Sequence, residues 1–571
     1  MPIKDIKSAL KACQSSFLTV GIFSMFINML MLVPAFYMLQ TYDRVITSGS
    51  IPTLVMLTLV MILLLVTMGG LEWVRSRILV RVSAKLDLLL GKKVYDTSFK
   101  QSLYSGGSNT SAQPLSDLTG LRQFLTGNGL FAFFDAPWTP IYIAVMWLFH
   151  PLFGYVAIAS VIILTLIAVV NEKLTKQLLT DANKESASIS QHTSKTLRNA
   201  EVIQSMGMLE DLRTSWQEKN QSVLGMQGMA SDRAGALTSI SKTFRLIVQS
   251  LILGLGAYLA VNQEITPGLM IAGSILLGRA LAPIDQMIAV WKQFSTARSQ
   301  YDRLNQLLSK IPEDREPMSL PDPKGHISLE AATVAPPGSK TPVISNITFS
   351  ASPGDAIGII GPSAAGKSTL ARAILGIWPA NSGKVRLDGA DIFQWDRKEL
   401  GPHIGYLPQD IELFEGSISA NISRFGEISP DLVVEAAKAA GVHELILKLP
   451  QGYDTVISAS GGGLSGGQRQ RIGLARAMYG SPKLIVLDEP NSNLDDQGEK
   501  ALSLAIQSLR ENGSTIFVIT HRASALASTN KLIVMQNGQL AMFGPTAEVL
   551  QRLQNPQGSK STAQPSPVVP A

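Results

Sequence analysis

The sequence predicts two domains of different fold class: an all-α membrane domain with six spanning helices, followed by a soluble α/β domain of the P-loop type. Three observations lead to this prediction. The chain of 571 residues is 46% hydrophobic and only 16% charged, whereas soluble proteins carry about 25% charged residues. The apolar excess lies in the first half of the chain. The second half contains a glycine-rich loop and an apolar run that ends in two acids.

Six apolar runs in the first half are candidates for membrane-spanning helices, which need about 20 residues each. They cover residues 17–39, 52–73, 140–148, 155–170, 245–261 and 269–291. The third run is short, so we expect its helix to begin earlier, within residues 131–138. His150 and Pro151 break the chain between the third and fourth runs, which predicts a helical hairpin.

The distribution of positive charge predicts the orientation of these helices. Lysines and arginines cluster between the second and third runs and again between the fourth and fifth, while residues 149–152 and 262–267 contain none. Because cytoplasmic loops carry the excess of lysine and arginine, both termini are expected in the cytoplasm. The net charge of +6 has the same explanation, and no nucleic-acid partner is expected. No small-residue cleavage site follows the first run, so no cleavable signal peptide is predicted.

The two long cytoplasmic segments show helical periodicity, for example at Val80, Leu86, Leu90 and Val94. We interpret them as extensions of the spanning helices into the cytoplasm. The alternative is a pair of separate amphipathic soluble domains between the spans.

Two charged residues, Arg279 and Asp285, lie in the sixth run on either side of Pro283. Proline removes the hydrogen bond to the carbonyl four residues earlier, so a kink is expected. Charge within a membrane usually faces a cavity or a partner. Arg279 and Asp285 are therefore candidates for a translocation path; the alternative is that they mark the cytoplasmic exit of the helix.

A glycine-rich motif of the form GxxxxGKS occupies residues 361–368, between an apolar strand at 356–360 and a helix from Ser368 to Leu375. This context is that of a loop that holds nucleotide phosphates on backbone N–H groups at a helix N-terminus. We expect Lys367 to contact the β- and γ-phosphates and Ser368 to bind Mg²⁺. The predicted ATP-binding residues are Gly361, Pro362, Ser363, Ala364, Ala365, Gly366, Lys367, Ser368 and Thr369.

Two consecutive acids, Asp488 and Glu489, end the apolar run 484–487. Asp488 is the expected second group on the Mg²⁺ side, directly or through water. Glu489 is expected to polarise the attacking water. The alternative is a pair of loop carboxylates without a catalytic role.

Between the loop and the acids lies the string LSGGQ: Leu464, Ser465, Gly466, Gly467 and Gln468. The three motifs in this order resemble the ATP-binding cassette (ABC) family. The resemblance implies that Gln409 senses Mg²⁺, that His521 contacts the γ-phosphate, and that Asp495 belongs to the loop that crosses to a partner cassette. It also implies that LSGGQ closes over ATP held by another subunit.

The chain contains one cassette and one membrane half, so the resemblance implies a homodimer with two shared ATP sites. Family members usually stack adenine on an aromatic residue before the glycine loop. Here residues 332–340 have none, and Val334 or Pro336 is expected to pack on the base instead.

The expected domain organisation follows from these motifs. We assign residues 1–16 to a cytoplasmic N-terminus, 17–305 to the transmembrane domain and 306–325 to a proline-containing linker. Residues 326–556 form the nucleotide-binding domain, and 557–571, rich in proline and serine, a disordered tail.

The membrane half is similar to type I secretion ABC subunits of Gram-negative inner membranes, on residues 33–45, 134–140 and 278–283. The resemblance implies ATP-driven export of an unfolded metalloprotease or related glycine-repeat protein with a C-terminal signal. It also implies a membrane-fusion adaptor and an outer-membrane channel as partners. The alternatives are a lipid or drug exporter of the same fold and a non-transporting ABC ATPase acting on ribosomes or DNA, which would lack membrane spans.

Overall fold

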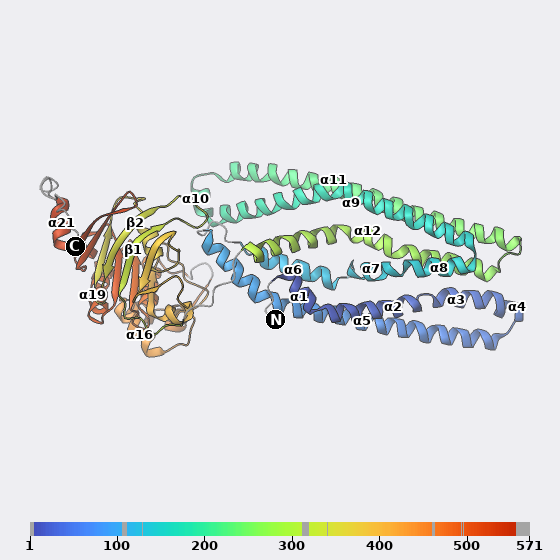
Figure 1. The fold of residues 1–571 in the computed structure, drawn as a ribbon, viewed down its shortest axis with the longest axis horizontal. Coiled ribbons are helices and arrows are strands. Elements are labelled where there is room, and N and C mark those ends of the chain that lie inside the picture. The colour runs from blue at the N-terminus through green and yellow to red at the C-terminus, as the bar shows by residue number, and fades with distance from the viewer. Residues whose placement is uncertain are drawn as a thin grey trace, which may run out of the picture. The chain divides into compact units, whose positions relative to one another are not determined.

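The computed structural model describes residues 5–105, 111–127, 129–310, 319–339, 341–458, 463–492, 494 and 496–554. The chain folds as two compact units. The first comprises Met1–Ser102 and Asn109–Pro312, and the second includes Glu313–Ala571. The first unit is helical and the second is α/β, as the blue-to-green and yellow-to-red ribbons of Figure 1 show.

The first unit consists mainly of long helices whose axes lie roughly along one line, with the chain running back and forth (Figure 1). Among the described residues, six helical segments are long and apolar enough to cross a membrane, which confirms the predicted number. The elements are α1 (Ile6–Ala12), α2 (Gln14–Leu30), α3 (Val33–Gln40), η1 (Thr41–Val45), α4 (Ile46–Ser48), α5 (Ile51–Tyr104), α6 (Gln113–Thr126), α7 (Gly129–Asp135), η2 (Ala136–Trp138), α8 (Thr139–Phe149), α9 (Pro151–Arg198), α10 (Ala200–Ser205), α11 (Leu209–Val261) and α12 (Pro267–Lys310).

Helices α5, α9 and α11 each continue without a break from a span into the long segments between the spans. Helix α5 has 54 residues, which at 1.5 Å per residue is roughly 80 Å, far more than the 30 Å core of a bilayer. Helices α9 and α11 have 48 and 53 residues. The prediction that the spans extend beyond the bilayer is confirmed, and the alternative of separate soluble domains is not.

The third span begins earlier than its apolar run, as expected, but at Gly129, two residues before the expected range 131–138. It consists of α7, the 3₁₀ turn η2 and α8, and together these cover residues 129–149. The turn contains Pro137 near its start, where a missing N–H does least harm. Helix α12, by contrast, carries Pro283 in its interior. It continues to Lys310, past residue 306, where the linker was expected to begin.

The second unit contains two main sheets with α13 (Lys367–Ile374) between them. Within the described residues, one sheet has the order β2-β1-β4-β5, with antiparallel pairs. The other has the order β12-β11-β3-β10-β9-β6 and is parallel except for its edge pair β11 and β12. The strands are β1 (Ile327–Val334), β2 (Ile344–Ala351), β3 (Ala356–Ile360), β4 (Ser382–Leu387), β5 (Ala390–Asp391), β6 (Ile404–Leu407), β7 (Gly416–Ser417), β8 (Val456–Ile457), β9 (Leu484–Asp488), β10 (Thr515–Ile519), β11 (Lys531–Gln536) and β12 (Gln539–Pro545).

The remaining helical elements of this unit are α14 (Arg397–Leu400), η3 (Gly401–His403), α15 (Ile418–Ile422), α16 (Pro430–Ala439), α17 (His443–Leu447), η4 (Gly452–Asp454), α18 (Gly466–Met478), α19 (Asp496–Glu511), α20 (Ala523–Leu526) and α21 (Thr546–Gln554). Helices α15 to α18 pack over the β6–β9 side of the large sheet, around a core that includes Leu407, Ile472 and Leu487. The predicted tail 557–571 lies outside the described residues.

Candidate ATP site

The strand register brings the predicted site residues to one edge of the large sheet. Ile519 of β10 pairs with Ile359 of β3 on one side and with Asp488 of β9 on the other. Because these strands are parallel, the segments that follow them all leave at the same edge. This is where open α/β sheets bind their ligands. The glycine loop, the two acids and His521 therefore converge, although they are up to 160 residues apart.

The glycine loop needs glycine at both of its ends. Gly361 has φ +154° and Gly366 has φ +94°, conformations that side chains rarely adopt. A Cβ on Gly361 would lie 2.3 Å from the carbonyl oxygen of Met535, and one on Gly366 would lie 2.6 Å from Ile344 Cγ2. Ala364 is also left-handed, with φ 64°. The sequence therefore forces a tight cradle at the start of α13.

Lys367 is the first residue of α13 and is buried. Its Nζ donates hydrogen bonds to the carbonyls of Gly361 at 2.7 Å and Pro362 at 3.0 Å, across the mouth of its own loop. Burial lowers the pKa of this ammonium, and the nearby Glu489 and Asp488 carboxylates oppose that shift. Of the backbone N–H groups predicted to face phosphate, that of Ala365 donates to the Pro362 carbonyl at 3.2 Å.

Asp488 ends β9 and is 4% exposed. Burial raises the pKa of its carboxyl group, and a hydrogen bond from Ser368 acts in the opposite direction. A buried carboxylate beside a hydroxyl offers the oxygen ligands that Mg²⁺ prefers. No cluster of three acidic, histidine or cysteine ligands occurs among the described residues.

Glu489 has a fixed and unusual backbone. Its φ is 50°, a left-handed conformation that costs a non-glycine residue about 1–2 kcal/mol. Hydrogen bonds hold it on both sides. Its N–H donates to the Ile519 carbonyl at 2.9 Å, and its own carbonyl accepts from Gln470 Nε2 at 3.3 Å.

The Glu489 carboxylate meets two of the side chains that the ABC resemblance indicated. Gln409 Nε2 donates to it at 3.2 Å from the segment after β6. His521 Nε2, from the segment after β10, lies 3.9 Å from the other carboxylate oxygen. Three loops thus contribute one side chain each to a partly exposed polar cluster next to the glycine loop.

The LSGGQ string stands at the start of α18. Ser465 is the N-cap; its hydroxyl accepts from the Gln468 N–H at 3.2 Å, and the Gln468 side chain accepts from the Ser465 N–H at 2.9 Å. This capping box satisfies two otherwise free donors. Leu464 packs against the neighbouring core, and Gly466 and Gly467 form the first turn. Asp495 lies outside the described residues.

Two functional features escaped sequence reasoning. Gln470, 2% exposed, also donates to the Pro490 carbonyl and so joins α18 to the acid loop. In the first unit, Arg75 Nη1 donates to Asp135 Oδ1 and to Ser24 Oγ, each at 2.9 Å, with both ions almost fully buried. In the sequence, the charge of Arg75 served only to predict the orientation of the helices. A charge that is buried, however, needs a partner of opposite charge.

Two predictions need correction or revision. Val334 is fully buried in the core between the sheets, so it presents no face to adenine; Pro336 is partly exposed.

In the sixth span, Asp285 forms an ion pair with Arg245 of α11 at 3.0 Å and accepts a hydrogen bond from the Ser241 hydroxyl, while Arg279 is exposed. Asp285 thus already has a cationic partner from the neighbouring helix.

The fold and the site together define an ABC transporter, with a helical membrane domain and an ATPase domain, and the chain belongs to that family. Residues 344–492 match the ABC transporter family, and residues 17–281 match the ABC transporter transmembrane region.

Individual relatives agree with this assignment. The chain is 45% identical, over 97% of its length and 95% of the relative's, to the type I secretion system ATP-binding protein PrsD of Rhizobium meliloti (strain 1021). It is 28% identical to the leukotoxin translocation ATP-binding protein LktB of Mannheimia haemolytica, over 94% of this chain and 76% of that one. A solved bacterial Atm1-family ABC exporter with ATP bound has the same fold. Its TM-score is 0.83 at 20% identity, over 96% of this chain and 99% of that one.

Proposed function

We propose that this protein is the ABC subunit of a type I secretion system, in which ATP hydrolysis drives export of an unfolded protein. The observation that carries the proposal is the 45% identity to PrsD, a protein named for type I secretion, over nearly the full length of both chains. The cassette geometry supports ATP hydrolysis independently of the names of relatives.

In the proposed reaction, Lys367 leaves the carbonyls of Gly361 and Pro362 and binds the β- and γ-phosphates. The remaining loop residues, from Pro362 to Thr369, surround the phosphates with the N-terminus of α13. Ser368, Asp488 and Gln409 would hold Mg²⁺, and the ion would supply charge neutralisation at the phosphates.

Glu489 orients the attacking water and takes up its proton, because its carboxylate points into the site beside the phosphate loop. Gln409 Nε2 fixes one carboxylate oxygen at 3.2 Å. His521 donates to the γ-phosphate as charge develops there. Preorganised donors of this kind do not have to reorient during the reaction.

The site is completed by a second copy of the chain. Ser465, Gly466, Gly467 and Gln468 at the start of α18 provide an exposed helix N-terminus, which suits the γ-phosphate of ATP bound to the partner. We propose a homodimer with two such sites and twelve spans. Asp495 would contribute to the contact between the cassettes.

The proposed setting is the inner membrane of a Gram-negative bacterium, with both termini and the cassette in the cytoplasm. A membrane-fusion adaptor and an outer-membrane channel would complete the conduit, and the substrate would be a metalloprotease or related glycine-repeat protein. Arg279, exposed in the sixth span, would line the path. The residues that follow the end of α12 at Lys310 would link the membrane domain to the cassette.

Secretion from a reconstituted system tests the proposal. The chain is expressed in a Gram-negative host with the adaptor, the channel and a glycine-repeat protein, and secreted protein is measured for wild type and Glu489→Gln. Secretion that depends on Glu489 and on the C-terminal signal is expected. ATPase activity stimulated by lipids or drugs but not by the unfolded protein would instead establish a lipid or drug exporter.

A further inference from the structure

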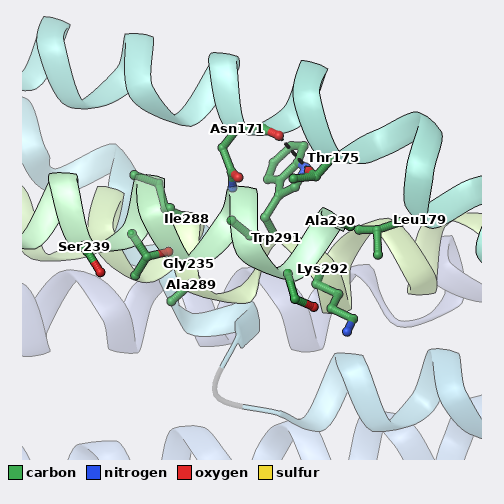
Figure 2. A pocket seen from close by; sticks show the side chains of 13 residues that line it. Asn171, Thr175, Leu179, Ala230, Gly235, Ser239, Ile288, Ala289, Trp291 and Lys292 are labelled. Atoms are coloured by element: carbon green, nitrogen blue, oxygen red, sulfur yellow. Dashed lines mark hydrogen bonds between the residues drawn. The ribbon is translucent and has the colours of Figure 1, made fainter. Parts of the chain in front are cut away.

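A cavity of about 400 Å³ lies between α9, α11 and α12 of the first unit (Figure 2). The polar side chains that line it are Asn171, Thr175, Ser231, Thr238, Ser239 and Lys292. They include hydrogen-bond donors and acceptors alike, so the lining favours no single class of ligand. A second polar cluster, beside His521 in the second unit, is more specific, because its hydrogen bonds run from known donors to one carboxylate.

The His521 side chain has little support of its own. It is 51% exposed, and its Nε2 lies 3.9 Å from Glu489 Oε1, which is longer than a hydrogen bond. The position of the ring therefore depends on the backbone on either side of it.

Thr520, which precedes His521, is fully buried and tied to the loop that carries the two acids. Its hydroxyl donates to Asn491 Oδ1 at 3.3 Å and accepts from the Arg522 N–H at 3.1 Å. Asn491 stands two residues after Glu489 in the sequence. The residue before His521 is thus fixed relative to the proposed water-orienting acid.

The residues after His521 are held by a single side chain, Glu499. Arg522 Nη1 donates to Glu499 Oε1, and the Ser524 hydroxyl donates to Glu499 Oε2 at 2.9 Å. Glu499 lies in the first turn of α19, where the helix dipole favours a carboxylate. Its side chain is 23% exposed, against 50% for Arg522, so the carboxylate is the more enclosed member of the pair.

A purely structural role explains this arrangement poorly. Ion pairs with an exposed member contribute little to stability, yet here both carboxylate oxygens are occupied by residues one and three positions after His521. Glu499 and Asn491 also line one small cavity, of about 10 Å³, so the anchors on the two sides of His521 lie close together.

We propose that Glu499 is a positioning residue for His521, which it keeps within reach of the γ-phosphate by holding Arg522 and Ser524. This proposal rests on the role proposed above for His521. Helix α19 begins directly after Asp495, the residue proposed to meet the partner cassette. A shift of the start of α19 would therefore reach His521 through Glu499.

The chain offers a matched control for the test. Glu499→Leu removes both acceptor oxygens, and Glu511→Leu makes the same change on the same helix. Glu511 accepts a hydrogen bond from Gln507 and serves as the control because that bond lies within α19. Glu499→Gln keeps an acceptor for Ser524 but loses the charge that attracts Arg522, so its effect should lie between those of wild type and Glu499→Leu.

The experiment uses the full-length protein in nanodiscs. The measured quantities are kcat and KM for ATP, ATP binding, the unfolding temperature, and the concentration of orthovanadate that halves the ATPase rate. Vanadate with ADP imitates the γ-phosphate in the transition state, so it reports a contact that ATP binding in the ground state does not require.

Glu499→Leu should lower kcat about ten- to hundredfold, as expected for a misplaced group, and should raise the vanadate concentration by a similar factor. ATP binding and the unfolding temperature should change little, and Glu511→Leu should behave as the wild type. A wild-type kcat in Glu499→Leu would overturn the proposal. So would a loss of ATP binding as large as the loss of kcat, which indicates a general structural defect. If Glu499→Leu does not fold, Glu499→Gln and Ser524→Ala carry the same comparison.

A double variant separates positioning from other effects of Glu499. In a His521→Ala background, Glu499→Leu should lower the remaining rate by less than about twofold, because the group that it positions is gone. An equal loss in both backgrounds would show that Glu499 acts without His521.

Failure of this proposal is distinguishable from failure of the proposed mechanism. If His521→Ala hydrolyses ATP at the wild-type rate, the role of His521 is wrong and its positioning by Glu499 is wrong with it. If His521→Ala is impaired and Glu499→Leu is not, only the positioning role is wrong.

Discussion

Gln470 donates a hydrogen bond from its side chain to the main-chain carbonyl of Glu489. Gln470 belongs to the same helix as LSGGQ, and Glu489 is the proposed water-orienting acid. Each cassette therefore connects the surface that it would offer to its partner's nucleotide with the acid of its own site. A shift of α18 on closure of the proposed dimer would act directly on the left-handed backbone of Glu489 through this hydrogen bond.

Replacement of Gln470 by leucine should uncouple these two elements. The carbonyls of Glu489 and Pro490 lose a buried donor, which costs about 1–3 kcal/mol of stability. ATP affinity should change little, because Gln470 does not face the phosphate loop, whereas turnover should fall about tenfold. Thermal unfolding, ATP binding and ATPase rate measure the three effects. An unchanged rate in a correctly folded variant would show that the Glu489 backbone needs no support from α18.

Glu489→Gln should retain ATP binding and lose turnover. The glutamine keeps the shape and a hydrogen-bond acceptor for Gln409, but it no longer accepts a proton from water. Loss of a general base typically costs about 10²–10⁴ in rate. The variant should also form a more stable ATP-bound dimer than the wild type. Near-normal hydrolysis by the purified variant would contradict the assigned role.

Mixed dimers test whether the sites are shared. Lys367→Ala removes a phosphate contact and should weaken ATP binding directly, and Ser465→Arg should block the partner's γ-phosphate. Neither homodimer should hydrolyse ATP. A dimer with one chain of each kind retains one intact site, so part of the activity should return. Verified mixed dimers without any recovery would indicate self-contained sites.

Substitution of a single member of the buried pair Arg75–Asp135 should lower the stability of the protein strongly. Asp135 also accepts from Asn28 Nδ2 at 3.0 Å, so its loss removes one partner from each of two buried donors, which then keep only their bonds to Ser24. Removing one partner of a buried pair costs about 3–5 kcal/mol, whereas replacing both with apolar residues is often neutral. Thermal unfolding in detergent should therefore rank Asp135→Leu well below the double variant Arg75→Met/Asp135→Leu. Equal unfolding temperatures for the single and the double variant would mean that Arg75 can be buried without a carboxylate partner at no cost in stability.

Cysteine labelling tests the path through the sixth span. In a Cys13→Ser background, Arg279→Cys should react with a membrane-impermeant thiol reagent in inside-out vesicles, because Arg279 is exposed. Asp285→Cys should react more slowly, since the Asp285 side chain is only 13% exposed and packs against Arg245 and Ser241. Substrate with its C-terminal signal should slow labelling at 279. If position 279 stays unreactive in every nucleotide state, Arg279 faces protein or lipid.

Sequence reasoning located what is local in the chain. The glycine loop was predictable because strand, loop and helix follow one another within residues 356–374, and Asp488 because it directly ends an apolar strand. The spans were predictable because length and apolarity suffice. The meeting of Gln409, Glu489 and His521 needed the family resemblance, since only the strand register brings together three segments far apart in sequence.

What remained hidden depends on tertiary partners. The partner of Asp285 was not predicted, because Arg245 is 40 residues away in the sequence. In the same way, Arg75 was interpreted as a cation flanking a span, because Asp135 is 60 residues away. Val334 was misplaced for a different reason. An apolar residue at the end of a strand faces either the core or solvent. Residues 332–340 contain only the end of β1, so they do not show which side of the strand is buried.

The hydrogen bonds from Lys367 to Gly361 and Pro362 imply that the phosphate loop contains an intramolecular competitor for its own ligand. In the proposed reaction the phosphates would take the place of these two carbonyl oxygens on the ammonium, so the measured affinity would be a difference between two sets of contacts. If the internal pair contributes about 1.4 kcal/mol, the apparent dissociation constant is raised about tenfold. A cassette built in this way releases its product more readily than its count of phosphate contacts suggests.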